Sequence, residues 1–137
     1  MAECDGTEPV EDDETLFRRV PVNPKYYNPE IDPLPTPLAF RPRDDDKTGL
    51  SVSRAKYMTM RDVVANPRGK SFYVAVLVAG SLRERGIRVE PAPEPGDPGH
   101  AELPDLRYDN RSSREAEEWQ VALATELCEV RGPFTPD

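Results

Sequence analysis

The hydrophobic pattern along the chain predicts a sheet built around one long strand. Residues 71–79 are almost continuously apolar and rich in β-branched and aromatic side chains, which is typical of a central strand covered on both faces. Shorter alternating segments predict further strands at 16–20, 50–53 and 87–90. The connection after residue 79 is too short for an ordinary parallel crossover, so the order of the strands stays open.

Helix signals surround these strands. Ser112 and Glu115 have the spacing of a capping box, and an apolar stripe with helical spacing follows them, made of Ala116, Trp119, Leu123, Leu127 and Val130. This pattern predicts a helix over about 112–130 that packs one face on the sheet, with Trp119 and Cys128 as core residues. Shorter capping boxes predict helices near 59–65 and 81–85, the second ended by Gly86.

Proline-rich connections join the predicted elements. Residues 21–48 contain seven prolines among scattered aromatic and aliphatic side chains, and residues 91–99 form a second proline-rich linker. A long structureless loop is uncommon in a compact domain, so we expect the first segment to wrap the surface, held by its side chains. The sequence therefore predicts one α+β or small α/β domain over residues 16–134, with a mixed sheet centred on 71–79.

Composition and charge then restrict the class of protein. The 137 residues are 36% hydrophobic and include 16 prolines, which excludes a membrane protein, a coiled coil, a collagen and a repeat array. The net charge of -8 is concentrated in residues 1–15, which hold seven acids and no base, whereas the rest has 19 acids and 18 bases. We expect 1–15 to be a disordered acidic tail, or alternatively a mimic of nucleic-acid charge. The near-neutral remainder disfavours direct nucleic-acid binding.

Cellular location and chemistry are only weakly marked. No apolar leader follows Met1, no segment is long enough to span a bilayer, and two cysteines make no disulfide framework, which favours a cytoplasmic protein. No nucleotide loop, nucleophile elbow or metal motif is present, and residues 44–46 are interpreted as a solvated turn. The leading hypothesis is therefore a non-enzymatic binding or accessory protein that acts with a protein partner and needs no cofactor or metal.

His100 is the single histidine of the chain and the first candidate for chemistry. It lies between Asp97 and Glu102, and a histidine flanked by carboxylates is able to act as a general base. The structural alternative is that His100 holds the linker in place by a hydrogen bond, and this alternative is favoured.

A second candidate set follows the order of the chain and consists of Arg18, Arg19, Ser51, Ser53 and Glu102. An arginine on a first strand, a serine on a middle strand and a late glutamate resemble the arrangement of ADP-ribosyltransferase-type folds. In those folds the arginine grips a cofactor phosphate and the glutamate stabilises an oxocarbenium ion. This resemblance implies an alternative function, a small enzyme or binder of a nucleotide or phosphorylated ligand. Otherwise Arg18 and Arg19 protect an edge strand from aggregation.

Three segments together resemble a group of small bacterial proteins from planctomycete-like genomes. They are LFRRVP at 16–21, GLSVS at 49–53 and DPGHAELP at 97–104, and the ending VRGPF at 130–134 is also similar. The resemblance implies that these segments belong to one fold. A role beside larger proteins of multi-gene bacterial systems is a further hypothesis that the motifs themselves do not show. The resemblance implies no catalytic residue, because no activity is established for the group.

Overall fold

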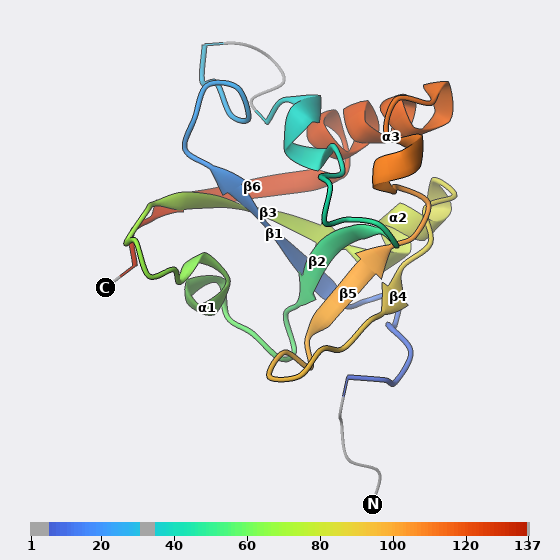
Figure 1. Ribbon diagram of the computed structural model, residues 1–137, viewed down its shortest axis with the longest axis horizontal. Coiled ribbons are helices and arrows are strands. Elements are labelled where there is room, and N and C mark those ends of the chain that lie inside the picture. The colour runs from blue at the N-terminus through green and yellow to red at the C-terminus, as the bar shows by residue number, and fades with distance from the viewer. Residues whose placement is uncertain (1–5, 31–34, 137) are drawn as a thin grey trace, which may run out of the picture.

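A computed structural model describes residues 6–30 and 35–136. The strands are β1 (Thr15–Pro21), β2 (Leu50–Arg54), β3 (Phe72–Val78), β4 (Glu90–Pro91), β5 (His100–Leu103) and β6 (Cys128–Phe134). The helices are α1 (Met60–Val64), α2 (Ala79–Glu84) and α3 (Arg114–Thr125), and two short 3-10 helices are η1 (Pro37–Phe40) and η2 (Tyr108–Asn110). The α+β class is confirmed (Figure 1).

The six strands form one sheet in the order β4-β5-β2-β1-β3-β6. Every pairing is antiparallel, so the expectation of a mixed sheet is wrong in this detail. β1 pairs with β3 along its whole length, from Thr15 to Pro21, but its pairing with β2 covers only Leu16 and Phe17. Beyond Phe17 the two strands separate, which opens the middle of the sheet.

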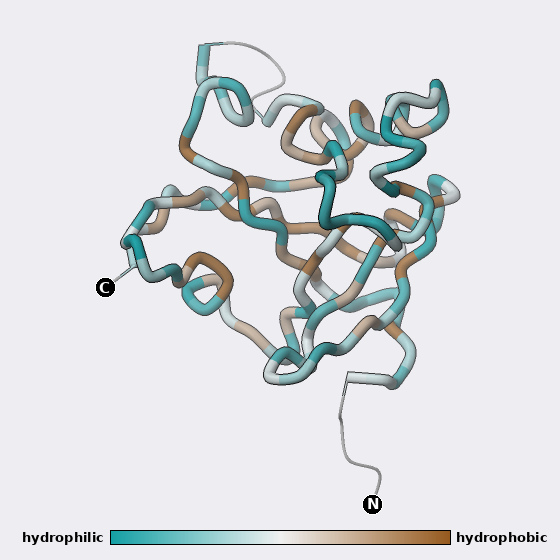
Figure 2. The backbone as a smooth tube through the Cα atoms, viewed as in Figure 1, coloured by the Kyte–Doolittle hydropathy of each residue, from teal (hydrophilic) through white to brown (hydrophobic). Residues whose placement is uncertain are grey.

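The two faces of the sheet carry cores of different size. The larger core lies under η1, α2 and α3 and uses inward side chains of the strands such as Leu16, Leu50 and Leu77. The smaller core lies under α1 and joins Phe17, Val64 and Val74. This division follows from strand geometry, because neighbouring residues of one strand point to opposite faces. Hydrophobic positions are frequent along the strands in the middle of the molecule (Figure 2).

The C-terminal helix is shorter than its apolar stripe predicts. α3 begins after Ser113, whose hydroxyl accepts the Ala116 N–H, and ends at Thr125, so Leu127 and Val130 lie outside it. Residues 128–134 instead form β6, in which Cys128 pairs with Leu77 of β3. Residues 128–134 form backbone hydrogen bonds with the edge of β3 that β1 leaves free, and this pairing is favoured over a longer helix. The prediction of one continuous helix over 112–130 is wrong beyond residue 125.

The predictions of the shorter helices and of the strand at 87–90 agree only in part with the structure. The capping box of Thr59 and Asp62 is confirmed at α1, and Gly86 has the expected left-handed φ of 83° after α2. α2 begins at Ala79 and has no side-chain cap, so the predicted capping box at Ser81 is wrong. The predicted strand at 87–90 is reduced to the two residues of β4.

The long proline-rich segment is held on the domain by its apolar side chains. Phe40 of η1 is completely buried in the larger core, and the Tyr27 ring stacks on Tyr73 of β3 with the ring centres 3.9 Å apart. Residues 31–34 of this segment lie outside the described residues. Trp119 is half-buried against the larger core and donates its indole N–H to the Arg85 carbonyl over 3.2 Å. Cys128 is half-buried, and burial raises the pKa of its thiol to about 11.

The acidic N-terminal segment packs on the sheet through one buried arginine. Arg54, at the end of β2, has a fully buried side chain and donates to both Glu14 carboxylate oxygens over 2.9 and 2.8 Å. It also donates to the carbonyls of Gly6, Glu8 and Pro9. Residues 6–14 therefore pack against the domain, in contrast to the disordered tail that their charge predicts. Residues 1–5 of that predicted tail are not among the described residues.

No helix in the described part of the chain is long and apolar enough to cross a bilayer.

Candidate functional site

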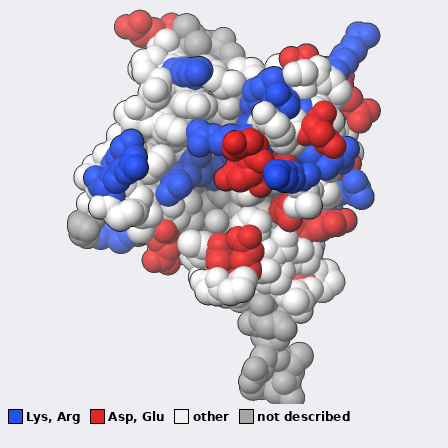
Figure 3. Space-filling view, viewed as in Figure 1, with Lys and Arg blue, Asp and Glu red and all other residues white. Residues whose placement is uncertain are grey.

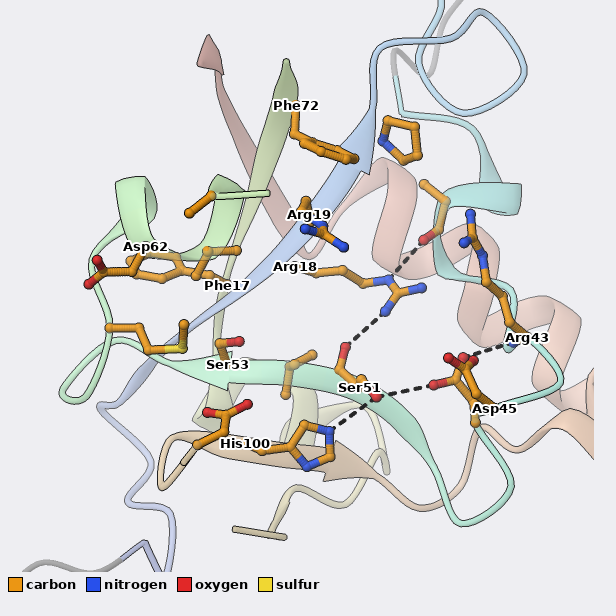
Figure 4. Close-up of a pocket in the computed structure, with 18 of the residues that line it drawn as sticks. Phe17, Arg18, Arg19, Arg43, Asp45, Ser51, Ser53, Asp62, Phe72 and His100 are labelled. Atoms are coloured by element: carbon orange, nitrogen blue, oxygen red, sulfur yellow. Dashed lines mark hydrogen bonds between the residues drawn. The ribbon is translucent and has the colours of Figure 1, made fainter. Parts of the chain in front are cut away.

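A cavity of about 430 Å³ opens where β1 and β2 separate. Its walls come from these two strands, from α1, from the turn at residues 43–46 and from the first residue of β5 (Figure 4). We call it the central cleft. Five of the candidate residues line it: Arg18, Arg19, Ser51, Ser53 and His100. The volume is within the range of about 300–1,000 Å³ that is typical of small-molecule sites.

Arg18 crosses the gap between the separated strands. Its Nε donates to the Ala39 carbonyl over 2.9 Å, and its Nη1 donates to the Ser51 carbonyl over 2.8 Å. The guanidinium thus occupies the place where a strand ladder between β1 and β2 would have continued. Burial lowers the pKa of Arg18 to about 10, and the negative charge of Asp46 opposes this effect. Arg18 remains a cation at neutral pH, yet no carboxylate of the described residues forms an ion pair with it.

Two further arginines line the central cleft, and the guanidinium group of each lies over an aromatic ring. The Arg19 guanidinium lies 4.5 Å from the centre of the Phe72 ring. The Arg43 guanidinium lies 5.6 Å from the centre of the Tyr26 ring, and its Nη2 is 3.4 Å from the Tyr26 hydroxyl. Both side chains belong to exposed residues, and neither has an ion pair among the described residues. Stacking on a ring orients a guanidinium without neutralising its charge.

Ser51 joins His100 to a buried carboxylate. The Ser51 hydroxyl donates to Asp46 Oδ1 over 3.1 Å, and His100 Nε2 lies 3.2 Å from the same hydroxyl oxygen. On the other side of the imidazole ring, Nδ1 lies 2.8 Å from the Ala92 carbonyl oxygen. Asp46 is 5% exposed and accepts the Arg43 N–H at its second oxygen over 2.8 Å. For Asp46 the interpretation of 44–46 as a solvated turn is therefore wrong.

The start of β5 is held in place by a close backbone approach. A β-carbon on Gly99 would lie 2.8 Å from the Tyr57 Cβ, so only glycine fits there. The close contact lets the Arg54 N–H donate to the Gly99 carbonyl over 2.8 Å. His100 follows directly and lies opposite Ser53 in the strand register, so its ring reaches the diagonal neighbour Ser51.

Glu102 lies beside the central cleft and does not line it. It is paired with Ser51 across β2 and β5, and its carboxylate accepts a hydrogen bond from the Thr48 hydroxyl. Ser53 lines the cleft, and its hydroxyl has no hydrogen-bond partner in the described part of the chain. The structure therefore brings the arginines, the serines and His100 together and leaves Glu102 at the margin.

The cleft has a polar side and an apolar side. Figure 4 shows Arg43, Asp45 and Ser51 on one side of Arg18 and Phe17 on the other. The apolar residues that line the cleft are Phe17, Leu38, Val52, Met58, Val63 and Phe72, together with the smaller Ala39, Ala65 and Pro21. Phe17 and Val63 belong to the smaller core, so this side is a continuation of that core.

Four aspartates also line the cleft, and two of them accept hydrogen bonds from neighbouring residues. Asp46 is bound as described, and Asp62 caps α1 by accepting the Thr59 N–H over 3.0 Å. Asp45 and Asp97 have no side-chain partner among the described residues. Space-filling Figure 3 shows basic and acidic side chains next to one another across the middle of the viewed face. Within the described ranges, no three His, Cys, Asp or Glu side chains are grouped to hold a metal ion.

Arg43, Asp46 and Tyr26 are cleft residues that the sequence did not indicate. One signal was available for Asp46, because an Asp three residues after Arg43 is the spacing at which a carboxylate accepts a turn N–H. Comparison with family models, with curated proteins and with solved structures finds no match to this chain. The interpretation of the cleft therefore depends on its own geometry.

Proposed function

We propose that the central cleft binds a small phosphorylated ligand of the nucleotide class. One observation carries the proposal: Arg18, Arg19 and Arg43 converge on one cavity, and none of them forms an ion pair among the described residues. An unpaired arginine at a partly buried position is costly, because burial disfavours its charge. A phosphate supplies the missing anion and matches the planar guanidinium fork.

Arg18 is the main anchor in this proposal. Two of its nitrogens are held by main-chain carbonyls, which fixes the plane of the guanidinium before any ligand arrives. Its Nη2 has no partner among the described residues, so it is able to donate to a phosphate oxygen. Arg19 and Arg43 add charge from the rim, with less loss of solvation.

The remaining lining favours a nucleotide over inorganic phosphate. The apolar side around Phe17 and Phe72 offers a surface for a flat base, and stacking of a base on an aromatic ring contributes about 1–3 kcal/mol. Asp45 and Asp97 are acceptors for sugar hydroxyl groups. A ligand with a phosphate, a sugar and a base therefore has a partner for each part.

A calorimetric comparison of simple ligands tests this proposal. We expect ADP and ADP-ribose to bind, and we expect adenosine and inorganic phosphate each to bind at least about tenfold more weakly, since each lacks part of the contacts. Equal binding of phosphate and ADP would contradict the nucleotide assignment. If no phosphorylated compound binds, the accessory role with a protein partner becomes the better proposal.

The order of the strands favours a second, catalytic candidate. Arg18, Ser51 and Glu102 lie on the three neighbouring strands β1, β2 and β5. This closeness supports the resemblance to ADP-ribosyltransferase-type folds as a basis for the second candidate. In such a reaction the bond between ribose and nicotinamide breaks, nicotinamide leaves with the bonding electrons, and water adds to the ribose carbon and loses a proton. The Glu102 carboxylate would stabilise the cationic ribose only after it releases Thr48.

Release of nicotinamide from NAD tests this candidate. We expect slow release that is lost in Glu102→Gln and kept in Glu117→Gln, because Glu117 is exposed on α3, which contributes no residue to the cleft. Absence of nicotinamide release, with ADP-ribose still bound, would restrict the protein to binding.

The acidic mimic receives less support from the contacts of the N-terminal segment. Glu8 and Glu14 face Arg54, and Asp12 pairs with Arg83 over 2.6 Å. Glu8 and Glu14 are thereby largely covered within the domain, which makes these two carboxylates less available to a basic partner.

A further inference from the structure

The hydrogen bonds around His100 allow two arrangements of its protons. A carboxylate only accepts hydrogen bonds, so the bond between Ser51 and Asp46 requires the serine proton on the line to Asp46. The hydroxyl oxygen then offers His100 only a lone pair, and Nε2 must donate to it. The Ala92 carbonyl also only accepts, so Nδ1 must donate as well. When the serine proton lies on the line to Asp46, both ring nitrogens carry a proton and the ring is a cation. When the serine proton lies on the line to Nε2, the ring is neutral and keeps its proton on Nδ1.

We propose that His100 is the acid–base group of the central cleft and that Ser51 couples its proton to ligand binding. When His100 loses a proton, Nδ1 keeps its own for Ala92 and Nε2 becomes an acceptor. The Ser51 hydroxyl then turns from Asp46 to His100. The cleft loses a cation, and Asp46 Oδ1 loses the proton that shields it from an anion. Both changes weaken binding of a phosphate. This inference rests on the proposed function, because the ligand is taken to be anionic.

The charges that face His100 come from several elements. Glu94 Oε1 lies 3.9 Å from Nδ1, and Asp97 lines the cleft in the loop before β5. Asp46 and Arg18 are linked to the ring through Ser51. Asp46 accepts a hydrogen bond from the Ser51 hydroxyl, and Arg18 donates one to the Ser51 carbonyl. Glu102 follows on the same strand, and Arg43 lies beyond Asp46. The carboxylates favour the imidazolium, whereas the arginines oppose it. A bound phosphate would shift this balance further toward the protonated ring.

The imidazole signals of the protein test the proton state directly. His100 is the one histidine of the sequence, so every imidazole nitrogen resonance belongs to it. We expect nitrogen NMR in mildly acidic solution to show protons on both nitrogens, and we expect the Nε2 proton to exchange with water faster in Ser51→Ala. Ser53→Ala is the matched control, because Ser53 lines the same cleft without bonding His100. Equal exchange in both variants would overturn the coupling through Ser51.

The pH dependence of ligand affinity tests the coupling itself. The probe is ADP-ribose, because its pyrophosphate charge does not change between about pH 5 and 8, where histidine titrates. We expect its affinity to fall by about tenfold over that range. The fall should disappear in His100→Gln and remain in Ser53→Ala. An unchanged fall in His100→Gln would overturn the proposal. If ADP-ribose binds at no pH, the proposed function fails, and the NMR exchange rates still decide the relay.

Discussion

Two arginines on neighbouring strands of the same sheet have opposite environments. Arg54 ends β2 with its side chain fully buried and its charge met by Glu14 and Glu8. Arg18 bridges β1 and β2, and its partners are two neutral carbonyls. Burial alone would lower the pKa of Arg54, but the bonds to Glu14 raise it above its usual value, whereas burial lowers that of Arg18 to about 10. The charge of Arg54 is therefore matched by carboxylates within the fold, whereas Arg18 has no carboxylate of the described residues bonded to it.

This difference indicates where a ligand is to be expected. A charge that is satisfied inside the protein contributes to folding and has no capacity left for a partner. A fixed charge in an open cleft, with no carboxylate bonded to it, is stabilised by an incoming anion. Substitutions at the two positions should therefore affect different properties, and the predictions below test that separation.

The largest expected effect is on stability, at Arg54. Arg54→Met leaves Glu14 nearly buried without its partner and removes the anchors of residues 6–14. We expect the free energy of unfolding in urea to fall by about 3–5 kcal/mol, the usual cost of breaking a buried pair. Arg114→Met is the control, because Arg114 forms an exposed pair with Glu118 and its loss should cost at most about 1 kcal/mol. Similar losses of unfolding free energy in both variants would contradict the role of Arg54 in holding residues 6–14 on the domain.

Arg18→Met should separate binding from stability. The variant loses hydrogen bonds to two carbonyls but leaves no carboxylate unpaired, so we expect a stability loss of about 2 kcal/mol. The affinity for ADP-ribose should fall by about a hundredfold, since a desolvated charge contact to the ligand is lost. Calorimetry and urea unfolding on the same sample measure the two effects. Binding that survives unchanged would mean that Arg18 is only a structural bridge.

Acid should release the N-terminal segment before the cleft is lost. The Tyr57 hydroxyl, followed by Lys56 and Arg54, holds the pKa of Glu8 at about 2 instead of 4.5. Burial tends to raise the pKa of Glu14, but its bonds to Arg54 and to a backbone N–H lower it. A carboxyl with a lowered folded pKa stabilises the fold above its unfolded pKa, and this stability disappears as the pH falls through the folded value.

The measurement is the midpoint of urea unfolding between about pH 5 and pH 2. We expect the midpoint to decrease over this window, and we expect the decrease to be smaller in Glu14→Gln, which has no carboxyl to protonate there. A decrease of the same size in Glu14→Gln would show that the acid sensitivity arises elsewhere.

The smallest expected effect is at Arg19. Its exposed guanidinium rests on Phe72, a contact that contributes about 0.5–1 kcal/mol at exposed sites. Arg19→Ala should lower ADP-ribose affinity by only a few fold, and the effect should vanish at high salt because the charge is exposed. A loss of affinity as large as that of Arg18→Met would show that Arg19, at the rim of the cleft, contributes as much to phosphate binding as Arg18.

The strands were easier to predict than the ends of the helices. β3 follows from a continuous apolar and β-branched segment, and β1 follows from a shorter apolar segment that ends at Pro21. β6 was hidden because Leu127 and Val130 continue the helical spacing of α3, while the competing hydrogen bonds come from β3, about 50 residues earlier in the chain. Local sequence does not record such long-range pairing.

The cleft was predictable only as separate candidates. His100 and the Ser51 segment were singled out by residue type, but their contact depends on the register of β2 with β5. Asp46 was missed because a run of aspartates indicates a turn in water, whereas the fold buries the last of them under Ser51. The packing of residues 6–14 was missed for the same reason, since their charge is matched by Arg54 from a distant strand.

The most direct test is a titration of the labelled protein with ADP-ribose, followed by backbone amide NMR. The account predicts that the amide signals of Arg18, Arg19, Ser51 and His100 shift as the ligand is added. It predicts that the signals of Arg54 and Glu14, whose side chains hold residues 6–14 on the domain, stay in place. Shifts confined to residues 6–14, or no shift at any residue, would contradict the assignment of the central cleft as the binding site.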